Sequence, residues 1–378
     1  METPCSACGS TDTYPLYEIE RIPVFLNKHY PNREAARSSP AAAINLRGCC
    51  RCGLVFNAQF ESAKMDYNED YVQSQGHAAS FQRYTLDVLD LLLQDIDTRR
   101  DKIVEIGCGK EAYFLNMLLD RGVDIVGFDP VYRGGNARIT PTFFDRAAAD
   151  KIQARAVVIR HTLDHIAKPL DFLQDLKTNL PADTLVFIES PRWEWILEKK
   201  AFWGISYEIC SYFSQNFFLR VFSGKAVMHR TFSNQYMIVK ARLGDLISTF
   251  LEKDDAERYP KALDTDIASY RQKIKSHARN YVWGAGAKGN IFANILDPQA
   301  KYIQAVIDIN SEKQGRFLPL TAHPCLAPEQ IPWETLGEET CLWIMNENYK
   351  KEILARIPEF TKGRVVVLGE PFPSQKAA

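Results

Sequence analysis

The sequence has no long hydrophobic run and no excess of charge of either sign. None of its apolar stretches reaches the roughly 18 residues that a membrane-spanning helix requires. Its first residues, Met-Glu-Thr-Pro-Cys, lack the basic and apolar regions of a signal peptide. We therefore expect a cytoplasmic protein that does not associate with a membrane.

The balance of charge argues against a further class of partner. The 378 residues include 46 lysines and arginines and 47 aspartates and glutamates, so we expect no broad surface for nucleic acid. A local phosphate pocket is still compatible with this balance. The length exceeds what one core usually organises, which predicts two or three domains. Nothing in the sequence indicates an oligomeric state.

Two short cysteine motifs predict a metal site near the N-terminus. Cys5 and Cys8 form one Cys-x-x-Cys motif, and Cys49 and Cys52 form the other, each followed by glycine. Cytoplasmic thiols stay reduced, and four thiolates in two pairs suit tetrahedral zinc. Such a closed site has no open coordination position, so we predict a structural Zn²⁺. The alternative is a set of reduced thiols in a small core.

A predicted β–α–β unit begins at residue 102. The apolar run 102–106 is typical of a buried parallel strand, 107–109 (Gly-Cys-Gly) forms a turn, and 113–119 is helical. A second strand, 124–129, ends in Asp129. Glycines at the first turn let a ligand approach the backbone closely, and an acid at the second strand's tip accepts hydrogen bonds from ribose.

Two cofactors compete for this loop. A dinucleotide fingerprint has glycine at its sixth position and no acid inside the strand. The Glu-x-Gly-x-Gly pattern found here resembles motif I of class I S-adenosylmethionine (SAM)-dependent methyltransferases. That resemblance implies that Glu105 holds the methionine end of SAM, Gly107 and Gly109 form the loop, and Asp129 holds the ribose. The motif's usual third glycine is Glu111 here. A turn without a ligand is the remaining alternative.

Two further strands, at 156–161 and 184–191, are predicted to extend the same sheet. Parallel strands present ligands at their carboxyl ends. We therefore expect Arg160 and His161 to line the SAM site and Glu189 to contact substrate. His161 is also a candidate catalytic residue, although packing is an alternative for it.

The chain as a whole resembles a narrower family, the three-domain sugar C-methyltransferases. Besides the cysteine motifs and the glycine loop, the resemblance rests on the segments 67–71, 75–77, 160–166, 207–214, 283–289, 308–316 and 345–349. It implies an α/β chain with a zinc-knuckle domain over 1–75, a class I (Rossmann-like) SAM domain over 76–242 and a Rossmann-like domain over 243–378. In that family a base removes the proton beside a keto group of a nucleotide-linked sugar, and the carbon takes the methyl group of SAM.

One departure from this family concerns the base. The family's segment carries a histidine where this chain has Ile209, which cannot accept a proton. The resemblance still implies catalytic roles for Tyr207, Glu208 and Tyr212, and a role in substrate binding for two upstream tyrosines, Tyr67 and Tyr71, the second also catalytic. Glu208 as the base, methyl transfer to oxygen or nitrogen, and binding without catalysis are all open.

The last third of the chain predicts a second Rossmann-like unit. A long helical pattern over 243–278 predicts a connector helix. Strands at 280–283 and 304–308 flank the loop Gly-Ala-Gly-Ala-Lys-Gly, which opens a helix and would attract a phosphate. The family resemblance implies that Lys288, Arg316 and Asn346 contact a nucleotide-linked sugar. A dinucleotide site and a fold repeat without ligand are the alternatives.

Overall fold

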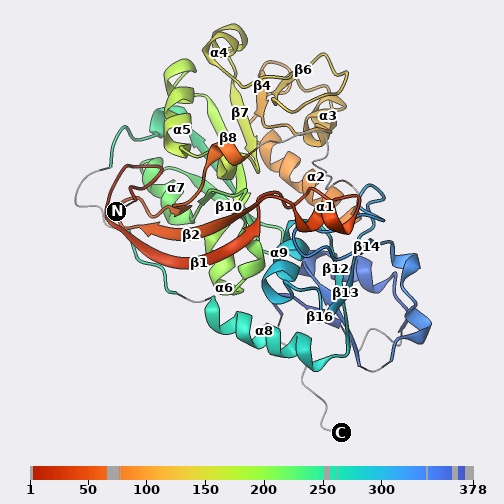
Figure 1. Ribbon diagram of the computed structural model, residues 1–378. Coiled ribbons are helices and arrows are strands. Elements are labelled where there is room, and N and C mark those ends of the chain that lie inside the picture. The colour runs from red at the N-terminus through yellow and green to blue at the C-terminus, as the bar shows by residue number, and fades with distance from the viewer. Residues whose placement is uncertain are drawn as a thin grey trace.

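The computed structural model describes residues 3–65, 76, 78–250, 256–261, 263–337, 339–359 and 365–370. Two of the predicted substrate contacts, Tyr67 and Tyr71, lie outside these residues. The described chain forms sheets of four, seven and five strands. In Figure 1 the seven-stranded sheet lies in the upper part, the five-stranded sheet at the lower right, and an N-terminal hairpin crosses the front. This arrangement confirms the predicted α/β class.

The N-terminal sheet is antiparallel, with the order β1-β2-β3-β9. Strands β1 (Thr13–Pro23) and β2 (Ala41–Cys49) form the hairpin, with the short helix α1 (Arg33–Arg37) between them, and β3 (Val55–Asn57) pairs with β2. Strand β9 (Ser211–Tyr212) comes from much later in the chain and pairs with β3. The edge strand of this N-terminal sheet therefore belongs to the segment that carries the predicted catalytic residues.

The central sheet has the order β10-β11-β8-β7-β4-β5-β6. Its strands are β4 (Ile103–Ile106), β5 (Ile125–Phe128), β6 (Ile139–Thr140), β7 (Ala156–Arg160), β8 (Leu185–Pro191), β10 (Val227–Thr231) and β11 (Tyr236–Arg242). The strands from β6 to β8 are parallel, and β11 and β10 are antiparallel. The chain order reverses at β4, so the carboxyl ends of β4 and β7 form a topological switch point, where open α/β sheets bind ligands.

Helices cover both faces of the central sheet. Successive side chains of a strand point to opposite faces, and the buried residues of β7 divide accordingly. Val157 and Ile159 pack in one cluster with α4 (Arg146–Ile152), α5 (Pro169–Asn179) and α7 (Gln215–Val221). Ala156 and Val158 pack in another with α2 (Ala79–Leu93) and α3 (Tyr113–Leu119).

The third sheet is parallel throughout, with the order β14-β13-β12-β15-β16. Its strands are β12 (Arg279–Trp283), β13 (Ile303–Ile307), β14 (Cys325–Leu326), β15 (Thr340–Ile344) and β16 (Val365–Val367). The glycine loop after β12 leads into α9 (Ala287–Leu296), and α10 (Lys350–Leu354) follows β15. This is the second Rossmann-like unit expected from the sequence.

The predicted connector helix over 243–278 is wrong over most of its described length. Residues Leu243–Asp245 form a single 3₁₀ turn, and the helix α8 covers only Asp264–Ser276. Between them, 246–250 and 256–261 are not helical. Gly244 and Pro260 explain the difference, because glycine lowers helix propensity and proline removes a backbone donor and clashes with the preceding turn.

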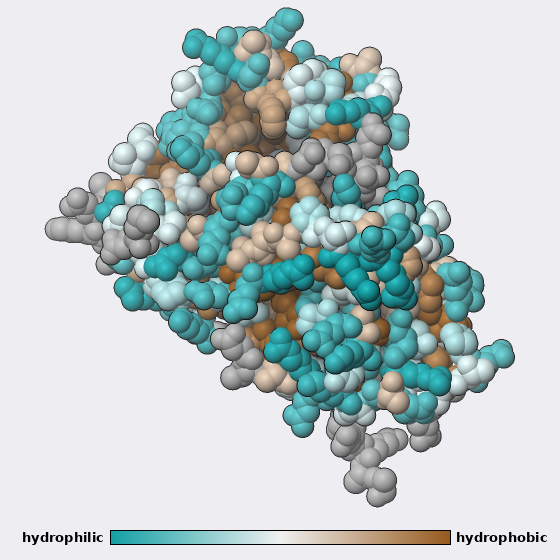
Figure 2. All heavy atoms as spheres, viewed as in Figure 1, coloured by the Kyte–Doolittle hydropathy of each residue, from teal (hydrophilic) through white to brown (hydrophobic). Residues whose placement is uncertain are grey.

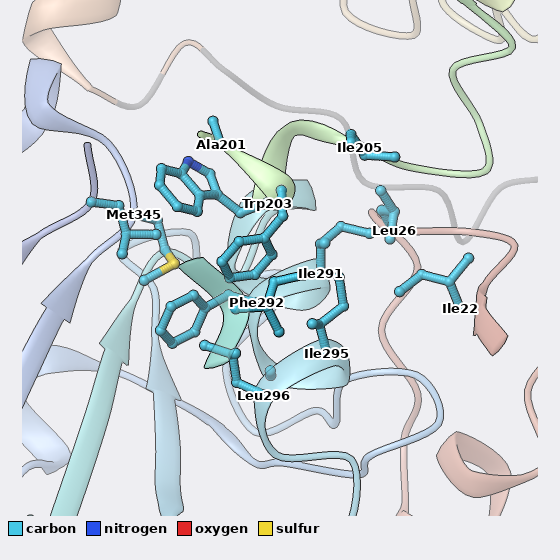
Figure 3. Packing of buried hydrophobic residues seen from close by; sticks show 14 of the residues in the cluster. Ile22, Leu26, Ala201, Trp203, Ile205, Ile291, Phe292, Ile295, Leu296 and Met345 are labelled. Atoms are coloured by element: carbon cyan, nitrogen blue, oxygen red, sulfur yellow. The ribbon is translucent and has the colours of Figure 1, made fainter. Parts of the chain in front are cut away.

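The first and third sheets share a hydrophobic core with the segment that follows β8 (Figure 3). The hairpin contributes residues from β1 and the loop after it, the segment after β8 contributes α6 (Trp193–Glu198) and the 3₁₀ turn Phe202–Gly204, and the last part contributes α9. Side chains labelled in this cluster are Ile22, Leu26, Ala201, Trp203, Ile205, Ile291, Phe292, Ile295, Leu296 and Met345. The Asn290 side-chain amide also donates to the Leu26 carbonyl at 3.0 Å. The first and last parts of the chain are thus packed against each other.

The surface of the face in view is mostly hydrophilic. Figure 2 shows hydrophobic residues in a hollow near α5 and β7, surrounded by polar side chains. In the described part of the chain, no helix combines the length and the apolar character that crossing a membrane requires.

Candidate functional site

The glycine loop lies at the switch point, at the carboxyl end of β4. Gly107 has a φ of +76°, and a Cβ there would lie 2.2 Å from Thr162 Oγ1, so only glycine fits the turn. Gly109 also has a positive φ, of +74°, and a Cβ there would meet no atom within 4 Å. Open space beside the backbone is what a closely approaching ligand requires.

The two acids predicted to hold SAM flank this space. Asp129 accepts hydrogen bonds from the Gly109 amide at 2.8 Å and the Val131 amide at 2.9 Å, which fixes the carboxylate at the tip of β5. Glu105 is 2% exposed, and its Oε2 has no hydrogen-bond partner among the described residues. Burial raises the pKa of the Glu105 carboxyl to about 7, although the positive charge of Arg160 opposes the shift.

These residues fit the methionine end of SAM. A buried carboxylate oxygen without a partner is costly unless a ligand supplies a donor, and the ammonium group of SAM is such a donor. The carboxylate of Asp129 can accept further hydrogen bonds from ribose hydroxyls. Their cofactor roles, like that of Arg160, stay predictions.

The ends of β7 and β8 carry a buried network centred on Glu189. Its side chain is fully buried, and its carboxylate accepts hydrogen bonds from Tyr84 and, at 2.5 Å, from Arg160 Nε. His161 Nε2 lies 2.8 Å from Glu189 Oε1. Burial alone would raise the pKa of Glu189, but the charge of Arg160 and the contacts of His161 hold it well below its usual range. A carboxylate enclosed in this way suits an orienting role better than the predicted direct contact with substrate.

Arg160 and His161 also contact aromatic rings outside this network. The guanidinium of Arg160 lies 4.1 Å from the centroid of the Phe114 ring, on the helix that follows the glycine loop. The His161 ring contacts Tyr236 edge to face, with centroids 4.7 Å apart, and its side chain is 15% exposed. His161 has a φ of +46°, a left-handed conformation that is uncommon for residues other than glycine.

The segment that carries the predicted catalytic residues is held by the N-terminal sheet. The Tyr207 hydroxyl accepts a hydrogen bond from the Glu61 amide at 2.9 Å, and Glu208 Oε1 accepts one from the Leu26 amide at 2.8 Å. The Tyr212 hydroxyl both accepts from the Ser206 amide and donates to the Ser206 carbonyl, at 2.9 and 3.0 Å. Tyr212 therefore fastens its own loop. The catalytic roles of these three side chains stay predictions.

Ile209 lies partly buried against the shared hydrophobic core. Its amide nitrogen lies 3.4 Å from Ser206 Oγ, and the neighbouring Cys210 amide donates to the Asp164 carbonyl at 3.0 Å. Asp164 belongs to the 3₁₀ turn Leu163–His165, directly after β7. The segment and the end of β7 are thus neighbours, with an aliphatic side chain where the resembled family has its base.

A cavity of about 290 Å³ lies at the carboxyl ends of β12, β13 and β15. Residues from the glycine loop, the ends of the strands and α10 line it: Trp283, Gly284, Gly286, Ala287, Lys288, Gly289, Asp308, Ile309, Asn310, Lys313, Met345, Asn346, Tyr349, Glu352, Ile353 and Arg356. Asn27 from the N-terminal part and Tyr236 from β11 complete the wall. A Cβ on Gly289 would lie 1.8 Å from the Gly284 carbonyl oxygen, so glycine is needed where the helix packs on the loop.

Of the predicted substrate contacts that the structure describes, Lys288 and Asn346 line this cavity, whereas Glu189 and Arg316 do not. Lys288 Nζ donates to Gln235 Oε1 at 2.8 Å and lies 4.7 Å from the Trp195 ring centroid. Burial lowers the pKa of Lys288 to about 7. The Asn346 amide donates to the same Gln235 oxygen at 3.1 Å. Arg316 is not among the lining residues, and its guanidinium lies 3.4 Å from the His29 carbonyl oxygen.

Four residues of this region escaped the sequence reasoning. Tyr84 and Tyr236 surround the Glu189 network, and Gln235 joins Lys288 to Asn346. Lys313, which is 6% exposed, places its Nζ 3.2 Å from Asp308 Oδ2 inside the cavity. Only Lys313 lies within one of the segments singled out from the sequence. Of the other three, Tyr84 lies in α2, Gln235 in a turn and Tyr236 at the start of β11, with no local signal.

The four predicted metal ligands lie together. The sulfur atoms of Cys5, Cys8, Cys49 and Cys52 are all within 4.8 Å of one another, and the two closest pairs are 3.5 and 3.6 Å apart. Tetrahedral zinc with Zn–S bonds of about 2.3 Å separates its sulfurs by about 3.8 Å. The cluster can therefore hold a metal ion. Cys50 lies outside it, as expected.

Two family models match the chain. A model described as a methyltransferase domain matches residues 77–224, and one described as a C-methyltransferase C-terminal domain matches residues 257–368. The first contains the glycine loop and the Glu189 network, and the second contains most of the residues that line the cavity over α9. A search of the curated proteins found no match.

Solved structures similar to this chain include methyltransferases from several organisms. A SAM-dependent methyltransferase from Mesorhizobium loti is 11% identical over 43% of this chain and 100% of its own, with a TM-score of 0.34. One from Anabaena variabilis is 12% identical over 43% of this chain and 85% of its own, with a TM-score of 0.31. One from Archaeoglobus fulgidus is 16% identical over 30% of this chain, which spans only 53% of that protein, with a TM-score of 0.25.

With TM-scores this low, the assignment rests on the chain's own features and on the family models. The sheet order, the loop with glycines at both strained positions, and the unpartnered Glu105 carboxylate oxygen agree with the methyltransferase match. The second match accounts for the remaining third of the chain. The protein is a SAM-dependent methyltransferase.

Proposed function

We propose that this enzyme transfers the methyl group of SAM to a carbon atom next to the keto group of a nucleotide-linked sugar. The observation that carries the proposal is the position of Tyr236. Its ring lines the cavity over α9 and also contacts His161, at the end of β7 beside the SAM loop. A substrate anchored in that cavity can therefore reach the region where the methyl group is delivered.

The chemistry of the cavity suits a nucleoside diphosphate. Lys288 and Lys313 place two amines in it, and the first turn of α9, a helix of ten residues, presents unpaired backbone amides. Trp283 and Tyr349 supply aromatic surface for a base. The two lysines suit the diphosphate, and the rings suit the base. An uncharged metabolite would leave both lysines without an anionic partner from the ligand.

A keto-sugar suits what the neighbouring residues can do. Bound SAM supplies an electrophilic methyl group on a sulfonium sulfur. The protein must hold the acceptor carbon in line with that methyl group, and such positioning contributes much of the rate of group transfer. It must also remove a proton from that carbon, which a neighbouring carbonyl makes acidic enough for a side-chain base. The description of the second family model as a C-methyltransferase domain agrees with this choice of acceptor.

A second candidate function is methyl transfer to oxygen or nitrogen on another polar metabolite. Ile209 favours it, because an aliphatic side chain stands where the resembled family has its base and lies against the hydrophobic core. A heteroatom with a lone pair needs less help from a base. Binding of SAM and substrate without transfer is the third possibility.

We also propose that the four-cysteine cluster holds a structural Zn²⁺. Three of the four cysteines are buried, and the cluster lies at the base of the β1–β2 hairpin, whose last residue is Cys49. Four thiolates leave no open position for catalysis. The metal would fix the end of the hairpin at which Thr13 pairs with Cys49.

Incubation with SAM carrying a labelled methyl group and a panel of nucleotide-linked keto-sugars tests the main proposal. We expect label on carbon, located by NMR of the product. Label on oxygen or nitrogen would support the second candidate, and tight SAM binding with no transfer would support the third. Lys288→Met should raise the KM for the sugar nucleotide, whereas Lys151→Met, at an exposed lysine of α4, should leave it unchanged.

A further inference from the structure

We propose that His161, oriented by Glu189, is the base that removes the proton from the substrate carbon in this enzyme. The inference rests on the proposed function, because it assigns the residue that performs the proton removal that C-methylation requires. It would also explain how the enzyme can remove a proton although Ile209 replaces the base histidine of the resembled family.

His161 lies between the two ligand regions. The next residue, Thr162, packs against Gly107 of the SAM loop, with its Oγ1 2.2 Å from where a glycine Cβ would lie. On its other side, the His161 ring contacts Tyr236, which lines the substrate cavity. A base for methyl transfer to carbon must reach both the acceptor carbon and the neighbourhood of the methyl group.

Glu189 prepares the imidazole for this role. His161 Nε2 lies 2.8 Å from Glu189 Oε1, within hydrogen-bond distance, although the ring is not yet aligned with the acceptor. Catalytic hydrogen bonds are often poorly aligned without ligand and tighten when substrate binds. With the proton of the neutral ring on Nε2, directed at the carboxylate, Nδ1 is the nitrogen that accepts a proton.

The setting of Glu189 stabilises the charge that would form. The carboxylate is fully buried, and Arg160 and Tyr84 hold it in place by hydrogen bonds to its two oxygens. A fixed anion beside the imidazole stabilises the positive charge that develops on the ring as it takes the proton of the substrate, and the anion itself need not accept that proton. The charged and titratable groups that face His161 are thus Glu189 from β8, Arg160 from β7, Tyr84 from α2 and Tyr236 from β11.

Two other candidate bases among the described residues make contacts elsewhere. Glu208 holds the Leu26 amide with one carboxylate oxygen. Lys288 donates to Gln235 and lies against Trp195. In addition, the φ of +46° at His161 is a strained conformation for histidine, and such strain persists mainly where the surrounding structure fixes a functional side chain.

The proposed step balances without a further reactant. The C–H bond next to the keto group breaks, its proton passes to His161 Nδ1, and its electron pair becomes that of an enolate. The enolate carbon forms the new C–CH₃ bond as the S–CH₃ bond breaks. The sulfonium sulfur keeps that electron pair and leaves as a neutral thioether. The imidazolium then releases its proton to water.

Hydrogen exchange with solvent measures the first half of this step alone. The full-length protein is incubated in D₂O with S-adenosylhomocysteine, which has no methyl group to transfer, and with the nucleotide-linked keto-sugar that the labelled-SAM panel identifies. Deuterium at the carbon next to the keto group is followed by NMR. We expect His161→Asn to slow the exchange by roughly 100-fold or more, in line with the usual contribution of a general base. SAM affinity, measured by calorimetry, should be nearly unchanged.

Two further variants separate catalysis from structure. Glu189→Gln should slow the exchange less than His161→Asn does and shift its pH profile, because it removes the anion that favours the imidazolium. His277→Asn makes the same substitution between α8 and β12, far from β7, and should leave the exchange unchanged.

The outcomes are distinct. Exchange at the wild-type rate in His161→Asn would show that another group is the base, while carbon methylation by the wild type would leave the proposed function standing. Loss of SAM affinity in parallel with the loss of exchange would make His161 a cofactor contact and overturn the inference. If the wild type neither exchanges the hydrogen nor methylates carbon in any keto-sugar, the proposed function fails and the inference falls with it.

Discussion

The buried carboxyl of Glu105 leads to a prediction in which stability and cofactor binding change in opposite directions. In the protein without ligand, Glu105 is 2% exposed, has an oxygen without a hydrogen-bond partner among the described residues, and has a pKa raised to about 7 by burial. Ionising this group therefore costs folding free energy. We predict that Glu105→Gln makes the ligand-free protein more stable at pH 8 and binds SAM more weakly.

The size of the stability gain follows from the raised pKa. The usual value for a glutamate is 4.5, and each pKa unit corresponds to about 1.4 kcal/mol. Between pH 4.5 and pH 7 the folded state holds a proton that the unfolded state has lost, so wild-type stability falls as the pH rises through this range. Above pH 7 the full penalty, about 3 kcal/mol, is present. Glu105→Gln should remove it at pH 8 and make little difference near pH 4.5.

The expected loss of affinity has the opposite cause. A hydrogen bond between charged partners contributes about 1.5–3 kcal/mol, and 1.4 kcal/mol is a factor of ten in Kd. Replacing the carboxylate that we expect to hold the SAM ammonium group should therefore raise the Kd roughly 10- to 100-fold at pH 8. Wild-type affinity should also decline below pH 7, as Glu105 takes up a proton, and the affinity of Glu105→Gln should not.

Urea unfolding at pH 5 and pH 8 measures the first effect, and calorimetric titration with SAM measures the second. Asp120→Asn is the matched control, because it removes the same charge at an exposed residue that ends α3 in the same β–α–β unit. A Glu105→Gln variant that is less stable than wild type at pH 8 would refute the burial argument. Unchanged SAM affinity would refute the assignment of the motif acid to the cofactor.

Three further outcomes are expected from other parts of the chain. Cys5→Ser or a strong chelator should remove one zinc per chain, detected by elemental analysis, and lower the Tm, whereas Cys50→Ser should do neither. Because burial lowers the pKa of Lys288 to about 7, its ammonium form destabilises the fold below pH 7 and the penalty fades as the pH rises toward 10.5. Lys288→Met should therefore raise the Tm at pH 6 more than at pH 9, and weaken UDP binding in calorimetric titration. Gly289→Ala would place a methyl group 1.8 Å from the Gly284 carbonyl oxygen, so urea unfolding should show a loss of about 1–3 kcal/mol or more.

The sequence predicted best those features that depend on residues close together in the chain. The strand 102–106, the helix 113–119 and the strand 124–129 appear as β4, α3 and β5 with nearly the same bounds. Strand period, glycine position and the acid at a strand tip are all local, and parallel order then brings the strand ends together. The cysteine motifs gave the four-sulfur cluster for the same reason, because ligand spacing is a local property.

What the sequence could not predict depends on contacts between distant segments. The long β1–β2 hairpin was not predicted, because its apolar and polar residues alternate only over short stretches such as Tyr17–Glu20 and Ile44–Arg47. The connector helix was predicted too long because a helical pattern continued past Gly244 and Pro260. Glu189 was expected to contact substrate, and that role stays a prediction. The sequence did not indicate its contacts with Tyr84 and His161, which lie on a helix and directly after a strand that only the folded sheet brings to the same carboxylate.

The shared core bears on how the substrate is held. If the last sheet were a separate domain on a flexible connector, part of the binding free energy of the substrate would be spent on closing the cavity over α9. Instead, Asn290 of α9 is bonded to the Leu26 carbonyl, and Gln235 of the methyltransferase part accepts hydrogen bonds from both Lys288 and Asn346. These contacts fix the cavity relative to the end of β7 before substrate arrives. For the proposed substrate, binding free energy gained at the nucleotide can then be used to align the reacting carbon, and such alignment contributes much of the rate of group transfer.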